Sequence, residues 1–389
     1  MLNITDNKKH TPSNITKTGI FTLAHLANDI YPNLYPVLLP MLMLQLHFSI
    51  AAAALISTVS SLTSQLLQPV MGYYADKIGG RRFIVGGLIL GSVFGAIALG
   101  LAPTYSILLI TLLIGGLGNA AFHPHASALV SEITGKRKGF GMSLFMIGGN
   151  FGRALAPIMA STAFMLGGRR GLLLVAIPGL IMALIMSTIV PKISSHENNK
   201  KLITSELKNG LGKASKLLIV VGLRSLTTLS TLTLVPILWK QWGHPLSETA
   251  GLLSLLFIAG SFGNILGGTI SDYVGPKPVL VASALFSSIF LILFLHTNNI
   301  ILAYIFIAFL GASLYSTSSV IMVFTQALFP DNKGMASGLT LGIGNTLGSL
   351  GVVVIGLIAD HSTPILALYV TAAALILSIP FVYKLKTLN

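Results

Sequence analysis

One carboxylate and one imidazole share a face of an apolar segment near the start of the chain. His25 and Asp29 stand four residues apart in "HLANDIYP", a spacing that brings side chains together on a helix. Ionisable groups inside apolar segments are costly and usually face a water-filled cavity. Asp29 is the only carboxylate well inside such a segment, so we predict that it carries protons, with His25 beside it. The alternatives are a permanent ion pair with Arg153 or a hydrogen bond to Asn28.

Two further histidines flank a proline in the apolar segment "FHPHAS". His123 and His125 project about 200° apart on a regular helix, so both face one cavity only if Pro124 distorts the turn. An imidazole titrates near neutral pH and can relay a proton or bind an anion. We expect His123 to handle protons with Asp29, and we take His125 as a candidate substrate contact. A metal site is the rival use, but the chain has no His-Glu-x-x-His helix, and we expect no metal or other cofactor.

Two arginines also lie inside apolar segments, one in each half of the chain. A planar, permanently charged guanidinium suits a carboxylate, phosphate or phosphonate group. We therefore predict that Arg153 and Arg224 hold an anionic substrate. The alternatives are that Arg153 is the partner of Asp29 and that Arg224 extends to a membrane surface. Four more residues are candidate substrate contacts: Tyr35, Asn150, Tyr315 and Asn345.

The composition places these groups in a membrane protein. Of 389 residues, 53% are hydrophobic and only 9% are charged, whereas soluble domains carry about 25% charged residues. The net charge of +14 comes mostly from residues between apolar segments, so it indicates topology and not nucleic-acid binding. There is no cysteine. Without a phosphate-binding glycine loop or a Gly-x-Ser-x-Gly motif, we expect no enzyme activity and an ion gradient as the energy source.

Apolar segments long enough to cross a bilayer recur along the whole chain. They predict twelve helices: 18–46, 51–74, 82–101, 105–130, 138–166, 171–191, 217–240, 248–271, 277–296, 299–327, 334–360 and 363–384. The excess of Lys and Arg in alternate loops places both termini in the cytoplasm. The predicted units are a polar tail (1–17), a six-helix bundle (18–191), a charged linker (192–216) and a second six-helix bundle with a short tail (217–389).

The two halves repeat a loop motif. "GYYADKIGGRR" and "GTISDYVGPKP" share two glycines and an aspartate, and Asp272 follows Asp76 by 196 residues. Because six helices return the chain to its starting side, these are parallel repeats. The first loop closely resembles the loop signature of the major facilitator superfamily. The resemblance implies that the two loops help to hold one transport state closed, through Gly72, Asp76, Gly79, Arg81, Arg82 and Asp272. The alternative is that Arg81 and Arg82 only mark the cytoplasmic side.

Three stretches carry a narrower resemblance: "HLANDIYP", "LLQPVMGYYADK", and "FHPHAS" followed by "GMSLFMIGGNFGRALAP". Together they are similar to the fosmidomycin-resistance branch of that superfamily, which implies an inner-membrane, proton-driven drug exporter. The chain departs from the branch at three positions. His125 and Ala128 stand where the branch has an acid and an arginine, and Arg153 stands where a small residue is usual.

The residues and the resemblance lead to one expectation. The fold is an all-α polytopic membrane protein with twelve transmembrane helices in two six-helix parallel repeats. The function is a proton-coupled exporter, an antiporter that moves a small anionic organic compound or drug by alternating access. We expect it to act as a monomer in the inner membrane. The alternatives are an importer, an exporter of a metallophore or metabolite, and a membrane sensor that transports nothing.

Overall fold

The computed structural model describes residues 14–134, 138–191, 204–328 and 342–385. Within these ranges, ten helices are long and apolar enough to span a membrane. One of the ten, Gly141–Ile189, contains two predicted spans, because Gly167 and Gly168 leave helical geometry between them. The first predicted span is absent from the ten because a short 3-10 turn divides it. The described helices therefore account for all twelve predicted spans.

The N-terminal half begins and ends its helices within a few residues of the predictions. Its elements are α1 (Asn14–Ile30), η1 (Tyr31–Asn33), α2 (Tyr35–Leu46), α3 (Ile50–Ser61), the π-helical turn η2 (Leu62–Leu66), α4 (Gln68–Ile78), α5 (Gly80–Leu101), α6 (Tyr105–Ile133), α7 (Lys138–Gly171), η4 (Leu172–Val175) and α8 (Ala176–Ile189).

The C-terminal half follows the predictions with two exceptions: α9 begins before the predicted span 217–240, and residues 334–341 of the predicted span 334–360 lie outside the described part. Its elements are α9 (Thr204–Gln241), α10 (Leu246–Val274), α11 (Pro276–Leu295), α12 (Ile300–Tyr315), α13 (Ser318–Leu328), α15 (Asn345–His361), α16 (Pro364–Ile376) and α17 (Ile379–Tyr383). A π-helical turn at 342–344 precedes α15. The first turns of α9 occupy part of the predicted linker, 192–216.

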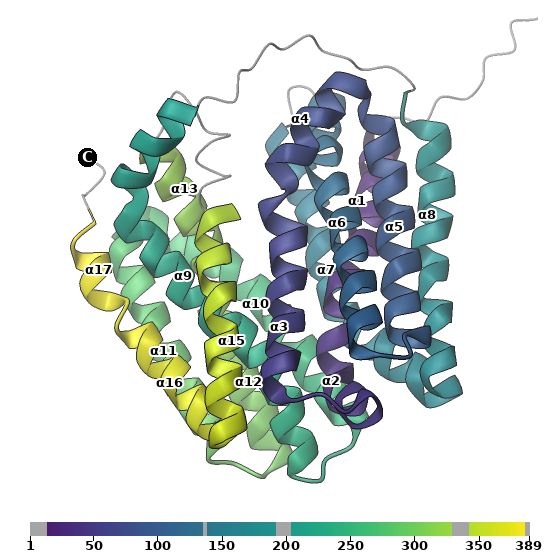
Figure 1. Ribbon diagram of the computed structural model, residues 1–389. Coiled ribbons are helices and arrows are strands. Elements are labelled where there is room, and N and C mark those ends of the chain that lie inside the picture. The colour runs from purple at the N-terminus through teal and green to yellow at the C-terminus, as the bar shows by residue number, and fades with distance from the viewer. Residues whose placement is uncertain (1–13, 135–137, 192–203, 329–341, 386–389) are drawn as a thin grey trace, which may run out of the picture.

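Figure 1 shows the helices in two groups, α1 to α8 in one and α9 to α17 in the other. The groups meet along two seams, where α3 packs against α15 and α7 packs against α10. We call the end of the molecule with Gly79 and Gly275 the linker end, because α8 ends and α9 begins there. The opposite end, with Ala102 and Ser362, is the far end.

Prolines and glycines set the shape of the helices around Asp29. The first span is interrupted just after this residue, where Pro32 lies in the 3-10 turn η1. Proline removes a backbone donor, so the regular ladder breaks there. On the facing helix α7, a Cβ atom at Gly148 or Gly152 would collide with the backbone of α1 at Thr22 or Leu26. The two glycines therefore let α7 approach α1 closely and bring its side chains to Asp29.

Candidate functional site

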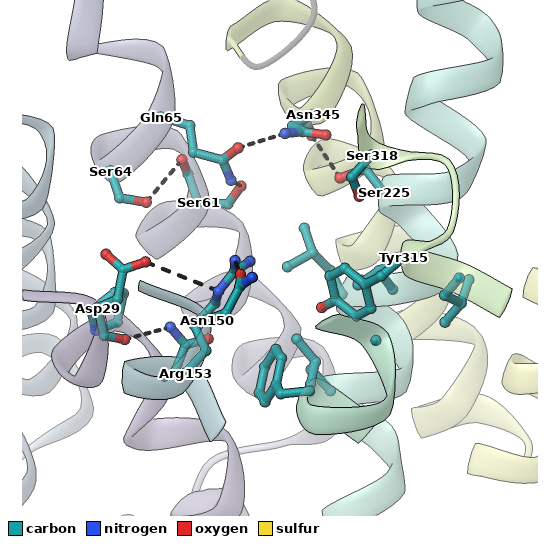
Figure 2. A pocket seen from close by; sticks show the side chains of 18 of the residues that line it. Asp29, Ser61, Ser64, Gln65, Asn150, Arg153, Ser225, Tyr315, Ser318 and Asn345 are labelled. Atoms are coloured by element: carbon teal, nitrogen blue, oxygen red, sulfur yellow. Dashed lines mark hydrogen bonds and ion pairs between the residues drawn. The ribbon is translucent and has the colours of Figure 1, made fainter. Parts of the chain in front are cut away.

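A cavity of about 420 Å³ lies between the two halves. Its wall contains eight of the residues that the sequence singled out: Asp29, Tyr35, His123, Asn150, Arg153, Arg224, Tyr315 and Asn345. In Figure 2, Asp29, Asn150 and Arg153 lie on one side of the cavity, and Tyr315 and Ser318 lie opposite them. These eight residues thus come together at one site, and His25, although outside the cavity wall, contacts Asp29.

Asp29 is the centre of a cluster of basic groups. It is only 9% exposed, and His25 is 3% exposed. One carboxylate oxygen lies 3.4 Å from His25 Nε2, the other lies 3.2 Å from His123 Nε2, and Arg153 Nε stands 4.0 Å away. Among the described residues, Asp29 is the only carboxylate in the cavity wall. Any proton that the cavity exchanges with a carboxylate must therefore pass through this cluster.

The ring of His25 has a fixed orientation. Its Nδ1 lies 2.7 Å from the backbone carbonyl of Phe145 and donates to it, because a carbonyl oxygen can only accept. The ring also stacks on Phe145, with centroids 4.1 Å apart. With Nδ1 protonated, Nε2 carries a proton only when the imidazole is cationic. His25 therefore offers Asp29 either a lone pair or a charged donor, which is what a proton-sharing pair requires.

His123 and Arg153 complete the cluster from α6 and α7. His123 Nε2 lies 3.4 Å from the side-chain amide of Asn28. Arg153 donates to the side-chain oxygen of Asn150. Two buried polar atoms here have no hydrogen-bond partner in the structure, Arg153 Nε and Asn28 Oδ1. Unpaired buried polar atoms are costly, so they mark a place where a ligand, water or proton can complete the bonding.

Arg224 is the positively charged residue that the C-terminal half contributes to the cavity wall. It is 7% exposed and donates to Ser283 Oγ at 2.9 Å and to the backbone carbonyl of Leu314. Within the part of the chain that the structure describes, no carboxylate pairs with it. Its environment thus differs from that of Arg153, which lies beside Asp29. A buried guanidinium without a counter-ion is a strong site for an anion.

The sequence reasoning missed a polar stripe on the second span. Ser57, Ser60, Ser61, Ser64 and Gln65 all line the cavity. Their separations of three, four, seven and eight residues are those of one helical face, so the pattern was readable in "STVSSLTSQ". Its hydroxyl groups carry no charge, so they do not stand out from the apolar segment around them. The stripe gives the cavity a hydrogen-bonding wall.

A hydrogen bond crosses the cavity between the halves. Asn345 donates to Gln65 at 2.6 Å, and its backbone carbonyl accepts from Ser225 at 3.2 Å (Figure 2). Gln65 belongs to the π-helical turn η2, and Asn345 directly follows the π-helical turn at 342–344. π-turns interrupt the regular hydrogen-bond ladder and often mark functional sites. The bond therefore joins two places where the helices are locally irregular.

His125 lies away from the cavity. It is buried, and a Cβ atom added at Gly80 would overlap its ring, so the imidazole packs against the start of α5. The position is explained by α6, which stays helical through Pro124 and so points His123 and His125 in different directions. We accordingly leave His125 out of the proposed substrate site and keep His123 as a candidate proton-handling residue.

The residues predicted to gate the linker end are only partly described. Gly79 has a φ of +94°, which favours glycine, and a Cβ atom at Gly72 would stand 3.1 Å from Pro124. Arg81 donates to the backbone carbonyl of Ser187, at the end of α8 in the same half. The remaining three predicted gating residues are Arg82 and Asp272, whose side chains are exposed, and Asp76, whose side chain lies outside the described part.

The Asp29 cluster also has the spacing of a metal site. The donor atoms of His25, Asp29 and His123 all lie within 4.8 Å of one another. The guanidinium of Arg153, 4.0 Å from the carboxylate, repels a divalent cation placed there. A proton adds only one charge and needs no such coordination shell. We therefore favour proton binding at this cluster.

Comparison with known proteins agrees with the fold. The chain is 28% identical to the fosmidomycin resistance protein of Escherichia coli K12, over 89% of this chain and 86% of that protein. It is 27% identical to the uncharacterized MFS-type transporter YfnC of Bacillus subtilis, over 88% and 86% of the two chains. Both relatives therefore match along nearly their whole length.

Solved transporters share the architecture at low sequence identity. A bacterial homologue of the human lysosomal transporter Spinster, in an inward-facing and occupied conformation, superimposes with a TM-score of 0.81 over 96% of this chain at 15% identity. The nucleoside transporter NupG gives a TM-score of 0.82 over 95% at 15% identity. The sequence model of the Major Facilitator Superfamily matches residues 21–218 and again residues 217–388. The chain is thus a transporter-fold membrane protein, not an enzyme, and belongs to the major facilitator superfamily.

Proposed function

We propose that this chain is a proton-coupled antiporter that exports a small hydrophilic anion by alternating access. The observation that carries the proposal is the Asp29 cluster, in which one carboxylate at the cavity wall is within reach of two imidazoles and a guanidinium. An exchangeable proton needs a group that titrates, a water-accessible cavity and neighbours that tolerate both charge states. The cluster has all three.

The substrate's anionic group is assigned to Arg224. Its guanidinium lines the cavity and lacks a described carboxylate partner, so an incoming anion meets an uncompensated charge. Arg153 is less available, because Asp29 already stands 4.0 Å away. The serine stripe of the second span and Tyr315 then offer hydrogen bonds to the polar body of the substrate. This lining favours a hydrophilic compound over a lipophilic one.

Antiport sets a further condition on the substrate. An anion that approached Asp29 directly would favour protonation of the cluster, so proton and substrate would bind together. Exchange requires competition, and a hydrogen-bond donor or cationic group on the substrate supplies it by occupying the Asp29 carboxylate. We therefore propose a substrate with an anionic group at Arg224 and a donor group at Asp29. Linkage then makes the proton leave when the substrate binds.

We further propose that the protein exports its substrate from the cytoplasm through the inner membrane. It acts as a monomer, and both of its termini lie in the cytoplasm. The basic loops at the linker end support that orientation by the positive-inside rule. The outward direction is supported by relatives named for resistance, the fosmidomycin resistance protein above all. Fosmidomycin is accordingly the first probe to use.

A ligand screen identifies the compound on which every later assay depends. Purified protein is heated with fosmidomycin, other phosphonates, carboxylates and, as a contrast, lipophilic cations, because a ligand that binds only the folded state raises the melting temperature. We expect stabilisation by hydrophilic anions and none by lipophilic cations. Stabilisation by lipophilic cations alone would contradict the anion site.

Transport by reconstituted vesicles tests the proton site. Asp29→Asn keeps the shape of the side chain but cannot ionise, so we expect loss of flux driven by a pH gradient. Exchange of labelled for unlabelled substrate should persist. The matched control is Glu132→Gln, which removes an exposed carboxylate outside the cavity. If Asp29→Asn vesicles stay fully coupled to the pH gradient, Asp29 is not the proton carrier.

A further inference from the structure

At the far end, a carboxylate of one half caps a helix of the other half. Asp360, in the last turn of α15, accepts from the backbone N–H groups of Ile50 and Ala51, each at 2.8 Å. These are the first two residues of α3, whose donors have no partner within their own helix. Asp360 thus binds two residues that lie 310 and 309 positions earlier in the chain, in the other repeat.

The start of α3 is capped from both halves. Ser49, the N-cap residue, accepts from Ala52 N at 3.2 Å, while Asp360 takes the two preceding donors. A negative charge at a helix N-terminus is also favoured by the helix dipole. The first turn of α3 therefore depends on a residue that moves with the opposite half, whereas Ser49 moves with its own.

Close packing along the same seam supports this arrangement. A Cβ atom at Gly356, one turn before Asp360, would collide with the Cβ of Ala54 and the Cα of Ala51. The glycine therefore lets α15 lie directly on the first turn of α3, which brings the carboxylate within bonding distance. Asp360 is itself exposed. Exposed charge-assisted bonds exchange readily with water, so the contact can form and break repeatedly.

We propose that Asp360 is a latch that holds the far end of the two halves closed. When the far end opens, α15 separates from the first turn of α3 and both backbone donors pass to water. When it closes, the carboxylate recaps the helix and the seam repacks over Gly356. The equilibrium between the closed and open far end is thus set in part by these two hydrogen bonds. The latch can therefore be tested in purified protein without a substrate or a proton gradient.

The chain has no cysteine, so a pair of introduced cysteines can carry spin labels without further changes. Pro103→Cys and Asn298→Cys place labels on exposed far-end loops, one in each half. Pulsed electron paramagnetic resonance then measures the distance between the halves in purified full-length protein. With Asp360→Ala, we expect the ratio of the long-distance to the short-distance population to rise at least about tenfold.

Two variants separate a latch from a simple helix cap. Ser49→Ala removes a cap of the same helix within one half, so it should leave the distance distribution unchanged. Gly356→Ala forces the helices apart and should move the distribution in the same direction as Asp360→Ala. Melting curves recorded on the same samples confirm that each protein is folded. An unchanged distribution in Asp360→Ala, or an equal shift in Ser49→Ala, would overturn the proposal.

Discussion

Replacing Arg224 tests whether the anion binds where the cavity has an uncompensated charge. The guanidinium is buried and donates only to Ser283 and to the Leu314 carbonyl among the described residues. Removing one partner of a buried, hydrogen-bonded charge pair costs about 2–5 kcal/mol of binding free energy. At about 1.4 kcal/mol per factor of ten, Arg224→Gln should weaken binding of the screened anion by at least about 30-fold.

The same substitution should affect folding much less than binding. The protein loses two hydrogen bonds, worth about 1 kcal/mol each, but it also loses a buried cation that no described carboxylate neutralises. These effects oppose each other. We therefore expect Arg224→Gln to keep a melting temperature close to that of the parent while its affinity falls.

Isothermal titration with the screened anion measures the affinity, and a thermal melt without ligand measures the stability. Arg169→Gln is the matched control, because Arg169 also donates two hydrogen bonds, to the backbone carbonyls of Leu99 and Ala102, but lies at the far end outside the cavity. It should bind the anion normally. If Arg224→Gln binds within about threefold of the parent, the anion site is elsewhere.

Three further predictions concern the scaffold of the site, and thermal melts of purified protein check each of them. Gly152→Val should lower the free energy of unfolding by about 1–3 kcal/mol, because its side chain would strike the Leu26 carbonyl on α1; an unchanged melt would refute the close approach of α1 and α7. His25→Phe should lower it by about 1–3 kcal/mol, since the Phe145 carbonyl loses its donor. Gly79→Ala should lower the free energy of unfolding by about 1–3 kcal/mol, because Gly79 has a φ of +94°, which strains an alanine. It should not change the anion affinity.

The sequence alone predicted the helices and the central charges. Apolar segments of membrane length have one stable solution in a bilayer, so the spans followed from hydropathy and their ends from loops and prolines. Asp29 and His25 were paired by helical spacing, and the expense of a buried charge pointed to a cavity. The proximity of His123 and Arg153 to Asp29 is a tertiary fact. The sequence indicated both residues as possible partners of Asp29, but their distances from it depend on how α6 and α7 pack against α1.

Contacts between the halves could not be predicted from one sequence. Asp360 is the last residue of the predicted span 334–360, and nothing in the sequence links it to Ile50, 310 residues earlier. The bond between Gln65 and Asn345 depends in the same way on how the repeats meet. The helix phase of about 200° already separated His123 from His125, but whether Pro124 distorts the turn depends on how α6 packs, and α6 stays helical there.

The central claim is that the Asp29 cluster gives up a proton when the substrate binds. A pH-indicator dye in weakly buffered detergent solution reports protons released as the screened anion is added to purified protein. The account predicts release of about one proton per bound anion by the parent protein and none by Asp29→Asn. Proton uptake on binding, or the same release from Asp29→Asn as from the parent, would contradict it.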